Sequence, residues 1–584
     1  MLPLLLAGLA GVLSGSDSLH IRINQMGYRP GASKVAVVCA LQRTALTEFT
    51  IIDLQGRRRH GPGPARESEP FGPCVQTYRL DFTAFRDQGE FLLVANGVAS
   101  PVVHITTKAY QGAADTLLYY LRQQRSGFNP IFRDSVHKKD ALLVDHPTRV
   151  GEFIPVSGGW ADAADYLQYV TTSANATFLL LQAARDHAGA FSDAFDERGL
   201  PGANRVPDVL DEARHGLEWL LRMFPEDSLL LNQLGDDRDH SFWDLPVNDS
   251  SDYGWGRGGF RPVYPCTGKP QGLFESKNRS TGMASTAGKY AAAFALGAAQ
   301  FAPRDAAFAK RLRQRAIAAF EVGERHPGVC QTAPGRAPYF YEEENWADDM
   351  ELGAAQLYAL TRDARYLAAA RRYAAQEPVT PWMGRDTARH YEFFPWHNNG
   401  HYELSRAAPQ ARNEMAANYR RGLEAVAARA NNGFRVGIPF IWCSNNLMAS
   451  VATQAMLYRR MTGDRRFAHL ETAAIDWLFG VNPWGMSMVI GMPAGGRTPR
   501  HPHSVMADRM GVATQLGGLV DGPVYRSIFQ NLRGIRLHDE DEYAQFNTGF
   551  VVYHDDLGDY STNEPIMDGT ANLLYVLAAL GAGR

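Results

Sequence analysis

From residue 108 to the C-terminus one pattern repeats, and it limits the possible folds more than any other feature: apolar residues at helical spacing. Apolar positions three and four residues apart over long segments predict amphipathic or buried helices. About eleven or twelve helices are expected, near residues 110–124, 163–187, 207–223, 281–301, 305–325, 348–362, 364–376, 413–430, 444–462, 465–479 and 566–581. Long loops rich in Gly, Pro and aromatic residues join them, which favours a barrel of paired helices over a simple bundle.

The preceding residues, 19–106, have a different texture. Short alternating or apolar runs at 20–28, 34–38, 48–53, 90–94 and 102–105 are separated by Gly, Pro and Asp turns. This spacing is typical of an immunoglobulin-like β-sandwich. We therefore predict a multidomain chain with a small β-sandwich at 19–106 and a large all-α domain at 107–584.

Composition and the N-terminus indicate where the protein acts. The 584 residues carry a net charge of −3 and no basic tract interleaved with aromatics, which argues against a nucleic-acid partner. Leu2 to Leu13 form an apolar stretch that is too short to span a bilayer and is similar to the core of a secretory signal. We interpret residues 1–18 as a signal peptide remnant, and predict a secreted or periplasmic protein without a membrane span.

The five cysteines, Cys39, Cys74, Cys266, Cys330 and Cys443, show no C-x-x-C spacing. Scattered cysteines predict neither a disulfide framework nor a zinc cluster. At most one bridge is expected.

Two acidic motifs carry the chemistry. Gly158-Gly159-Trp160 is followed by Asp162 and Asp165, just before an apolar-periodic segment, which places both carboxylates at or near a helix N-terminus. Taken alone, the pair is readily explained as an N-cap and a first-turn acid. However, almost 400 residues later His554-Asp555-Asp556-Leu557-Gly558-Asp559-Tyr560-Ser561-Thr562-Asn563-Glu564 again precedes a helical run.

Together with other motifs these stretches resemble glycoside hydrolase family 9, the cellulase family, in its branch with an N-terminal immunoglobulin-like domain. The further matches are Pro207-Asp208-Val209-Leu210-Asp211-Glu212, Asp239-His240-Ser241-Phe242-Trp243, Asp348-Asp349-Met350 and Gly517-Gly518-Leu519-Val520-Asp521-Gly522-Pro523. They run in family order over essentially the whole chain. The resemblance implies an (α/α)6 barrel and an inverting β-1,4-glucan hydrolase that needs no cofactor for its chemistry.

The resemblance also implies roles for individual residues. Asp165 would be the general base, Glu564 the general acid, and Asp162 would help to hold the attacking water. Two departures stand out: Ala164 replaces the family's usual glycine, and the arginine expected after the histidine of Pro499-Arg500-His501-Pro502-His503-Ser504 is missing. All three carboxylates of the chemistry remain.

Sugar rings offer apolar faces ringed by hydroxyls, so a glucan cleft needs aromatic platforms with polar rims. The expected platforms are Trp243, Trp255, Trp346, Trp396, Tyr341 and Tyr391, and the expected hydroxyl partners are His240 and His503. Tyr560 is a further expected binding residue, beside Glu564. By contrast, Trp219 and Trp477 lie on apolar helix faces and are expected in the core.

A structural calcium ion is a further expectation, on Asn345, Asp348 and Asp349, where some family members bind it. Calcium sites need several oxygens from separate segments, and the acidic run Asp236-Asp237-Arg238-Asp239 is better explained as a solvated loop.

Endoglucanase action on cellulose or related β-glucans is the preferred interpretation. An exo-acting cellobiohydrolase, β-glucosidase or exo-glucosaminidase would keep the same acid and base. A non-enzymatic carbohydrate-binding homologue is the remaining alternative, motivated by Ala164 and by the altered histidine loop.

Overall fold

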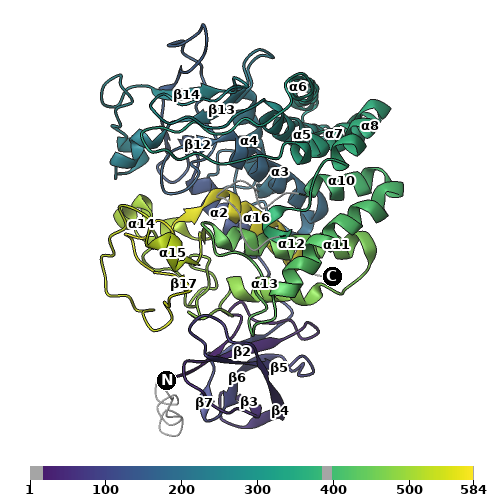
Figure 1. Cartoon of the computed structure of the whole chain (residues 1–584), viewed down its shortest axis with the longest axis vertical. Helices are drawn as coiled ribbons and strands as arrows, with labels where there is room; N and C mark the ends of the chain where they lie inside the picture. The colour runs from purple at the N-terminus through teal and green to yellow at the C-terminus, as the bar shows by residue number, and fades with distance from the viewer. Residues whose placement is uncertain (1–17, 385–397, 583–584) are drawn as a thin grey trace.

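The N-terminal part of the computed structural model, which describes residues 18–384 and 398–582, is a β-sandwich (Figure 1). Its antiparallel strands are β1 (Leu19–Arg22), β2 (Val35–Ala40), β3 (Glu48–Asp53), β4 (Arg58–Ser68), β5 (Gln76–Asp81), β6 (Gly89–Ala95), β7 (Val98–Ala99) and β8 (Val103–Ile105). The long β4 pairs with β5 near its end and with β3 near its start, so it joins both sheets. The predicted sandwich is confirmed, although β4, β5 and the two-residue β7 were not predicted. β4 contains Gly and Pro residues, which are typical of turns.

Disulfide bonds join Cys39 to Cys74 and Cys266 to Cys330, whereas Cys443 is free and buried. The expectation of at most one bridge was therefore wrong. The paired cysteines are 35 and 64 residues apart, and tertiary packing, not local spacing, brings them together.

Among the described helices, an inner ring contains α3 (Val170–Asp186), α5 (Ala284–Phe301), α7 (Ala347–Thr361), α10 (Asn399–Ala407), α12 (Ser444–Thr462) and α16 (Met567–Gly581). Each touches the next, and α16 closes the ring against α3. The outer partners are α2 (Ala113–Gln123), α4 (Asp208–Met223), α6 (Ala306–Arg325), α8 (Ala364–Ala374), α11 (Arg412–Arg429) and α13 (Ala468–Leu478). The predicted (α/α)6 barrel is confirmed.

Sequence explains which helices lie inside. The alanine-rich α5 is buried on nearly every side, whereas α6 buries one apolar face and exposes charged residues. Two expectations need correction. The segment at 377–412 contains the polar helix α10, and α3 begins at Val170 rather than near residue 163. Asp162 and Asp165 consequently lie in a loop before the helix, not in its first turn.

A four-stranded sheet at one end of the barrel holds this loop. Its order is β11 (Asp140–Leu143), β14 (Arg261–Pro265), β13 (Leu231–Leu234) and β12 (Gln168–Tyr169). Smaller pairs are β9 (Gly127–Asn129) with β10 (Asp134–Val136), β15 (Leu519–Val520) with β18 (Pro565–Ile566), and β16 (Val524–Tyr525) with β17 (Val551–Val552). Short helices α9 (Pro381–Gly384), α14 (Val505–Met510) and α15 (Arg526–Phe529) lie in the remaining loops.

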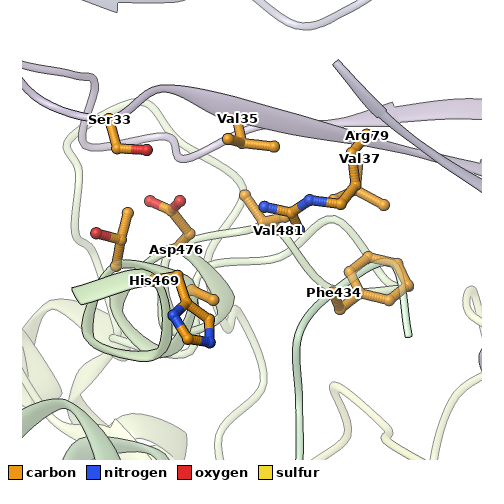
Figure 2. Close-up of a pocket in the computed structure, with 10 residues that line it drawn as sticks. Ser33, Val35, Val37, Arg79, Phe434, His469, Asp476 and Val481 are labelled. Atoms are coloured by element: carbon orange, nitrogen blue, oxygen red, sulfur yellow. The ribbon is translucent and has the colours of Figure 1, made fainter. Parts of the chain in front are cut away.

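The β-sandwich contacts the barrel beside α13. Asn24 Nδ2 donates to Asp476 Oδ1 at 2.8 Å, and Arg79 donates to the carbonyl of Gly433 at 2.6 Å. A cavity of about 40 Å³ remains between the two domains, lined by Val35, Val37, Arg79, Phe434, His469 and Asp476 among others (Figure 2). It has space for a few water molecules but not for a sugar ring. No helix in the described part of the chain is long and apolar enough to cross a membrane.

Candidate active site

Asp165 and His240 meet because two short strands pair. β12 begins three residues after Asp165, and β13 ends six residues before His240; Gln168 lies opposite Leu234 in their antiparallel ladder. His240 Nε2 donates to Asp165 Oδ2 at 3.1 Å, and the Asp165 side chain is 27% exposed. Although burial opposes protonation, the hydrogen bond and charge of Asp165 raise the pKa of His240 to about 10. A cationic imidazole therefore stands beside this carboxylate at neutral pH.

Asp162 has a different environment. It is buried, its Oδ1 accepts a hydrogen bond from the Thr172 hydroxyl, and its Oδ2 accepts one from the Tyr341 hydroxyl. Burial and the nearby charge of Asp568 raise the pKa of Asp162 well above its usual range, while the two hydroxyl donors oppose the rise. Its main-chain carbonyl accepts from Met567 N at 2.9 Å, which joins this loop to the start of α16.

Glu564 stands immediately before β18, which pairs with β15. The Ala164 amide donates to Glu564 Oε1 at 3.0 Å, so the loop of Asp162 and Asp165 touches the carboxyl from 400 positions later in the chain. Burial, with the charges of Asp521 and Asp165, raises the pKa of Glu564 well above its usual range, and the Ala164 amide opposes this. The two loops thus place the partly exposed carboxylate of Asp165 near the carboxyl of Glu564, whose surroundings favour the protonated form.

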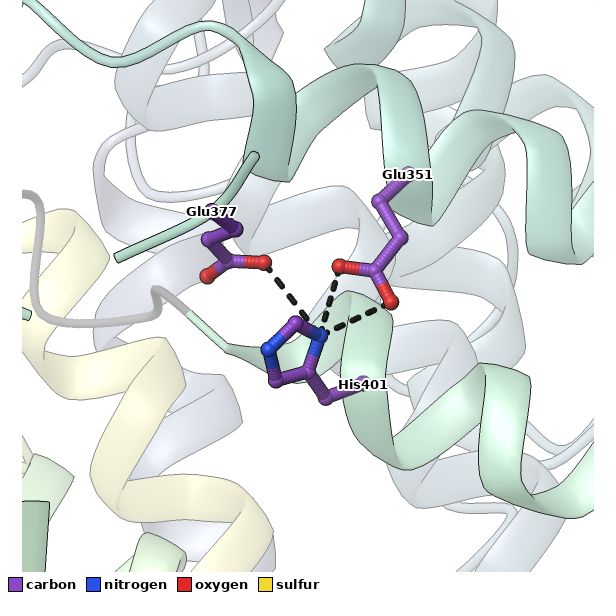
Figure 3. Close-up of side chains that lie close together, drawn as sticks. All are labelled: Glu351, Glu377 and His401. Atoms are coloured by element: carbon purple, nitrogen blue, oxygen red, sulfur yellow. Dashed lines mark hydrogen bonds and ion pairs between the residues drawn. The ribbon is translucent and has the colours of Figure 1, made fainter. Parts of the chain in front are cut away.

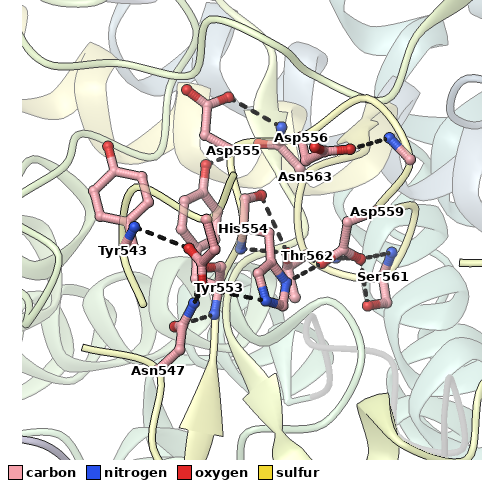
Figure 4. Close-up of polar contacts among 12 residues, drawn as sticks. Tyr543, Asn547, Tyr553, His554, Asp555, Asp556, Asp559, Ser561, Thr562 and Asn563 are labelled. Carbon is pink, nitrogen blue, oxygen red and sulfur yellow. Dashed lines mark hydrogen bonds and ion pairs between the residues drawn. The ribbon is translucent and has the colours of Figure 1, made fainter. Parts of the chain in front are cut away.

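A polar network fixes the loop before Glu564 (Figure 4). His554 Nδ1 lies 2.7 Å from Asp559 Oδ2, which also accepts from the Thr562 hydroxyl at 2.8 Å. The Tyr553 hydroxyl donates to Asn563 Oδ1 at 2.8 Å. Buried charge-assisted bonds of this kind are short and directional, so the loop has little freedom where Glu564 leaves it.

Five side chains with aromatic rings form a row in which each ring lies beside the next. Ring centroids lie 4.8 Å apart for Trp243 and His503, 6.0 Å for His503 and Tyr560, 5.5 Å for Tyr560 and Trp442, and 6.3 Å for Trp442 and Tyr339. Trp243 and Tyr339 are more than one third exposed. We call these five residues the aromatic strip.

Three predicted binding residues therefore come together in the strip, namely Trp243, His503 and Tyr560. Burial lowers the pKa of His503, and its neutral ring donates from Nδ1 to the carbonyl of Leu557 at 2.6 Å. His240 also lies at the site, where its imidazole bonds Asp165. Trp346 instead packs against Tyr373 and the barrel core, and Trp396 and Tyr391 lie outside the described residues.

Sequence reasoning missed Trp442 and Tyr339. Trp442 lies just before α12, and its Nε1 donates to Asp521 Oδ2 at 2.8 Å. Tyr339 comes from the segment before α7. Asp165 and Glu564 also lie shortly before inner helices, α3 and α16. A search of every segment that precedes an inner helix would have found both rings.

The predicted calcium residues do not converge as a calcium site requires. The Lys289 ammonium bonds Asp349 Oδ2 at 2.5 Å and also bonds Glu343, so a side chain supplies the cation there. Asn345 accepts from the amide of Ala347 at the start of α7. With Asp349 neutralised by a buried lysine, these residues do not fit Ca²⁺.

The motif around Gly159 forms a structural support beneath the site. Trp160 Nε1 donates to Glu212 Oε1 at 2.7 Å, which links the Gly-Gly-Trp turn to α4. Gly159 has φ of 75°, and a Cβ there would approach the Trp219 ring to 2.5 Å, so only glycine fits. Trp219 and Trp477 are fully buried, in the core as expected.

Comparison with known proteins agrees with this arrangement. A model of glycosyl hydrolase family 9 matches residues 110–577, and one of the cellulase N-terminal ig-like domain matches residues 17–100. Endoglucanase C of Cellulomonas fimi is 27% identical over 526 residues, which cover 81% of this chain but only 44% of that protein. The xyloglucan-specific endo-beta-1,4-glucanase BoGH9A of Bacteroides ovatus is 26% identical over 561 residues, 89% of each protein.

A solved structure is similar over the whole chain. The crystal structure of a metagenome-derived glycoside hydrolase family 9 endoglucanase has 26% sequence identity and a TM-score of 0.75, covering 99% of this chain and 100% of that one. The family model alone covers well over half of the sequence. The resemblance read from the motifs is therefore confirmed, and the chain belongs to glycosyl hydrolase family 9.

Proposed function

We propose that this protein is a secreted endoglucanase that hydrolyses β-1,4-glucosidic bonds in cellulose or related β-glucans with inversion of configuration. The observation that carries the proposal is the contrast between two carboxyl groups at one site. Glu564 is held in surroundings that favour its protonated form, whereas Asp165 is partly exposed and paired with a cationic imidazole. Pairs of carboxyl groups with opposed environments are the mark of an acid and a base in glycosidases.

Glu564 is the proposed proton donor. The Ala164 amide occupies Oε1, so the acidic proton belongs on Oε2, from which it can pass to the leaving glycosidic oxygen. The raised pKa keeps this proton in place near neutral pH. General acid catalysis of this kind contributes on the order of 10²–10⁴ to the rate.

Asp165 is the proposed base. It would take a proton from water as that water attacks the anomeric carbon on the face opposite to Glu564, which gives inversion in a single displacement. His240 holds Asp165 Oδ2 in place, and Asp165 Oδ1 accepts from Leu167 N at 3.3 Å. Asp162, buried behind the same loop, would orient the water and the loop.

The aromatic strip supports a glucan as substrate, because exposed rings can stack on the apolar faces of successive glucose units. The names of the two relatives, one of them xyloglucan-specific, favour endo action on β-1,4-linked glucans. Two disulfide bonds support an oxidising compartment, and the apolar stretch from Leu2 to Leu13 supports export.

The test is Glu564→Gln, which keeps the size of the side chain and removes the acid. Hydrolysis of cello-oligosaccharides should fall by about 10²–10⁴-fold, and the loss should shrink on aryl glycosides whose leaving groups need little protonation. Glu542→Gln, an exposed carboxylate in the same region, is the matched control and should change the rate by less than about threefold.

A second measurement follows the configuration of the product. In proton NMR of soluble β-glucan hydrolysis, the α-anomer should appear first and the β-anomer should grow only by mutarotation. An initial β-anomer, or equal losses in Glu564→Gln on good and poor leaving groups, would contradict the assigned roles.

A further inference from the structure

Three buried side chains, Glu351, Glu377 and His401, form a compact cluster (Figure 3). Glu351 comes from α7, Glu377 from the segment after α8, and His401 from the first turn of α10. His401 Nδ1 lies 2.9 and 2.7 Å from the two oxygens of Glu351, and 3.5 Å from Glu377 Oε2. One ligand atom from each residue lies within 4.8 Å of the others.

The charges of this cluster are not balanced by a basic side chain. In the described parts of the chain, neither carboxylate forms an ion pair with a lysine or an arginine; the only pairs are those with His401. Two other buried acids of this domain have such a cation. Lys289 neutralises Asp349, as described above, and Arg261 bonds Asp140 at 2.8 Å. Two buried carboxylates with one imidazole leave room for an external cation.

The surrounding backbone shapes the cluster. Gly400 lies against Glu351, since a Cβ at this position would approach the Glu351 carboxyl carbon to 3.0 Å. Glu377 Oε1 accepts from Asn398 N at 2.8 Å and from its side-chain amide at 2.5 Å, which orients the carboxylate. Glu377 Oε2 is buried and faces His401, 3.5 Å from Nδ1. Carboxylates oriented by neighbouring hydrogen-bond donors are typical of metal ligands.

We propose that Glu351, Glu377 and His401 bind one divalent transition-metal ion of the zinc type. Imidazole nitrogen together with carboxylate oxygen suits Zn²⁺ and its neighbours in the first transition row, whereas Ca²⁺ and Mg²⁺ prefer all-oxygen sites. Ligands at 2.0–2.2 Å from a tetrahedral Zn²⁺ stand roughly 3.3–3.6 Å apart. Side-chain movements of about 1 Å bring the observed atoms to this spacing.

The ion would join three consecutive elements of the barrel, α7, the segment after α8, and α10. Its role is structural, because in the described residues none of the three ligands hydrogen-bonds Asp162, Asp165 or Glu564. Metal removal should therefore lower stability first, and the proposal stands independently of the proposed reaction.

The test uses the full-length protein, dialysed against a chelator and then titrated with zinc chloride. Elemental analysis after desalting should find about one Zn²⁺ per chain, and the ion should raise Tm by at least about 2 °C. Cobalt(II) added to the same unsubstituted protein should give visible absorption bands of low-symmetry coordination. This measurement does not depend on the folding of any variant.

Glu377→Gln keeps the shape of the side chain and should abolish both zinc retention and the zinc-dependent rise in Tm. His137→Gln is the matched control, since His137 is a buried histidine that forms an ion pair with Asp249. It should retain one Zn²⁺. The proposal is overturned if the unsubstituted protein retains none of Zn²⁺, Co²⁺, Mn²⁺ or Ni²⁺. It is also overturned if Glu377→Gln raises Tm without any metal dependence, because the two carboxyl groups would then be a proton-sharing pair.

Discussion

Removal of the Tyr341 hydroxyl tests how Asp162 is held. Tyr341 donates to Asp162 Oδ2 while Thr172 donates to Oδ1, and only 4% of Asp162 and 8% of Tyr341 is exposed. Water therefore cannot easily replace the hydroxyl in Tyr341→Phe. Removal of the donor leaves a buried acceptor unsatisfied, which costs about 1–3 kcal/mol, equivalent to roughly 5–150-fold in a rate if the transition state bears the whole loss.

We expect kcat on a soluble β-glucan to fall by about 10–100-fold in Tyr341→Phe, with KM changed by less than about threefold because the ring remains. Tyr169→Phe is the matched control. Tyr169 packs its ring 4.5 Å from that of Tyr341, is equally buried, and forms no hydrogen bond to Asp162. It should retain turnover within about threefold of the unsubstituted protein.

Thermal unfolding as a function of pH gives a second readout. The raised pKa of Asp162 means that the native protein keeps a proton which the unfolded chain has released. The associated stability is fully present below the unfolded pKa, and is lost as pH rises through the folded pKa. Without the Tyr341 hydroxyl that pKa rises further, so the Tm deficit of Tyr341→Phe should grow as pH rises through the folded pKa of Asp162 in the unsubstituted protein.

Two outcomes would refute this reasoning. If Tyr341→Phe turns over glucan at the normal rate, Asp162 does not depend on the hydroxyl. If Tyr169→Phe loses as much activity as Tyr341→Phe, ring packing and not the hydrogen bond is the cause. A Tm deficit that is independent of pH would mean that Asp162 does not titrate differently in the two proteins.

Two other predictions concern the loop and the sheet that holds it. The backbone φ of Ala164 is not positive, so Ala164→Gly should keep turnover within about threefold. Ala164→Pro removes the amide donor to Glu564 and should cost more than tenfold in kcat. Arg261 bonds Asp140 and the carbonyl of Tyr166, and Arg261→Met should destabilise the protein by about 3–5 kcal/mol in urea unfolding. Unchanged unfolding midpoints would show that this pair does not hold the sheet.

The residues of the two acidic motifs could be found from sequence, but their geometry could not. Asp162 and Asp165 were expected in a first helical turn, because the apolar period continues upstream of Val170. In the structure the pairing of β12 with β13 draws residues 161–167 into a loop. That pairing also brings His240 to Asp165, 75 residues away. A two-residue strand has no period that sequence analysis can detect.

The residues of the aromatic strip also fall into a group that sequence predicted and a group that it did not. Trp243, His503 and Tyr560 belong to motifs and were predicted, whereas Trp442 and Tyr339 stand alone in the sequence. A solitary ring before a helix carries no local signal, and only the closure of the helical ring shows which such rings face one another. Trp346, a loop aromatic beside a motif, is half-buried and packs against Tyr373.

By itself the sequence determined the β-sandwich, the paired helices and the acidic residues of the proposed reaction, because hydrophobic periodicity and short motifs are properties of local chain segments. Tertiary structure alone decided the two disulfides, the pairing of Asp165 with His240, the Lys289 cation in place of calcium, and the cluster of Glu351, Glu377 and His401. Each of these joins residues that are distant in sequence, and such contacts depend on how whole elements pack rather than on what any one segment encodes.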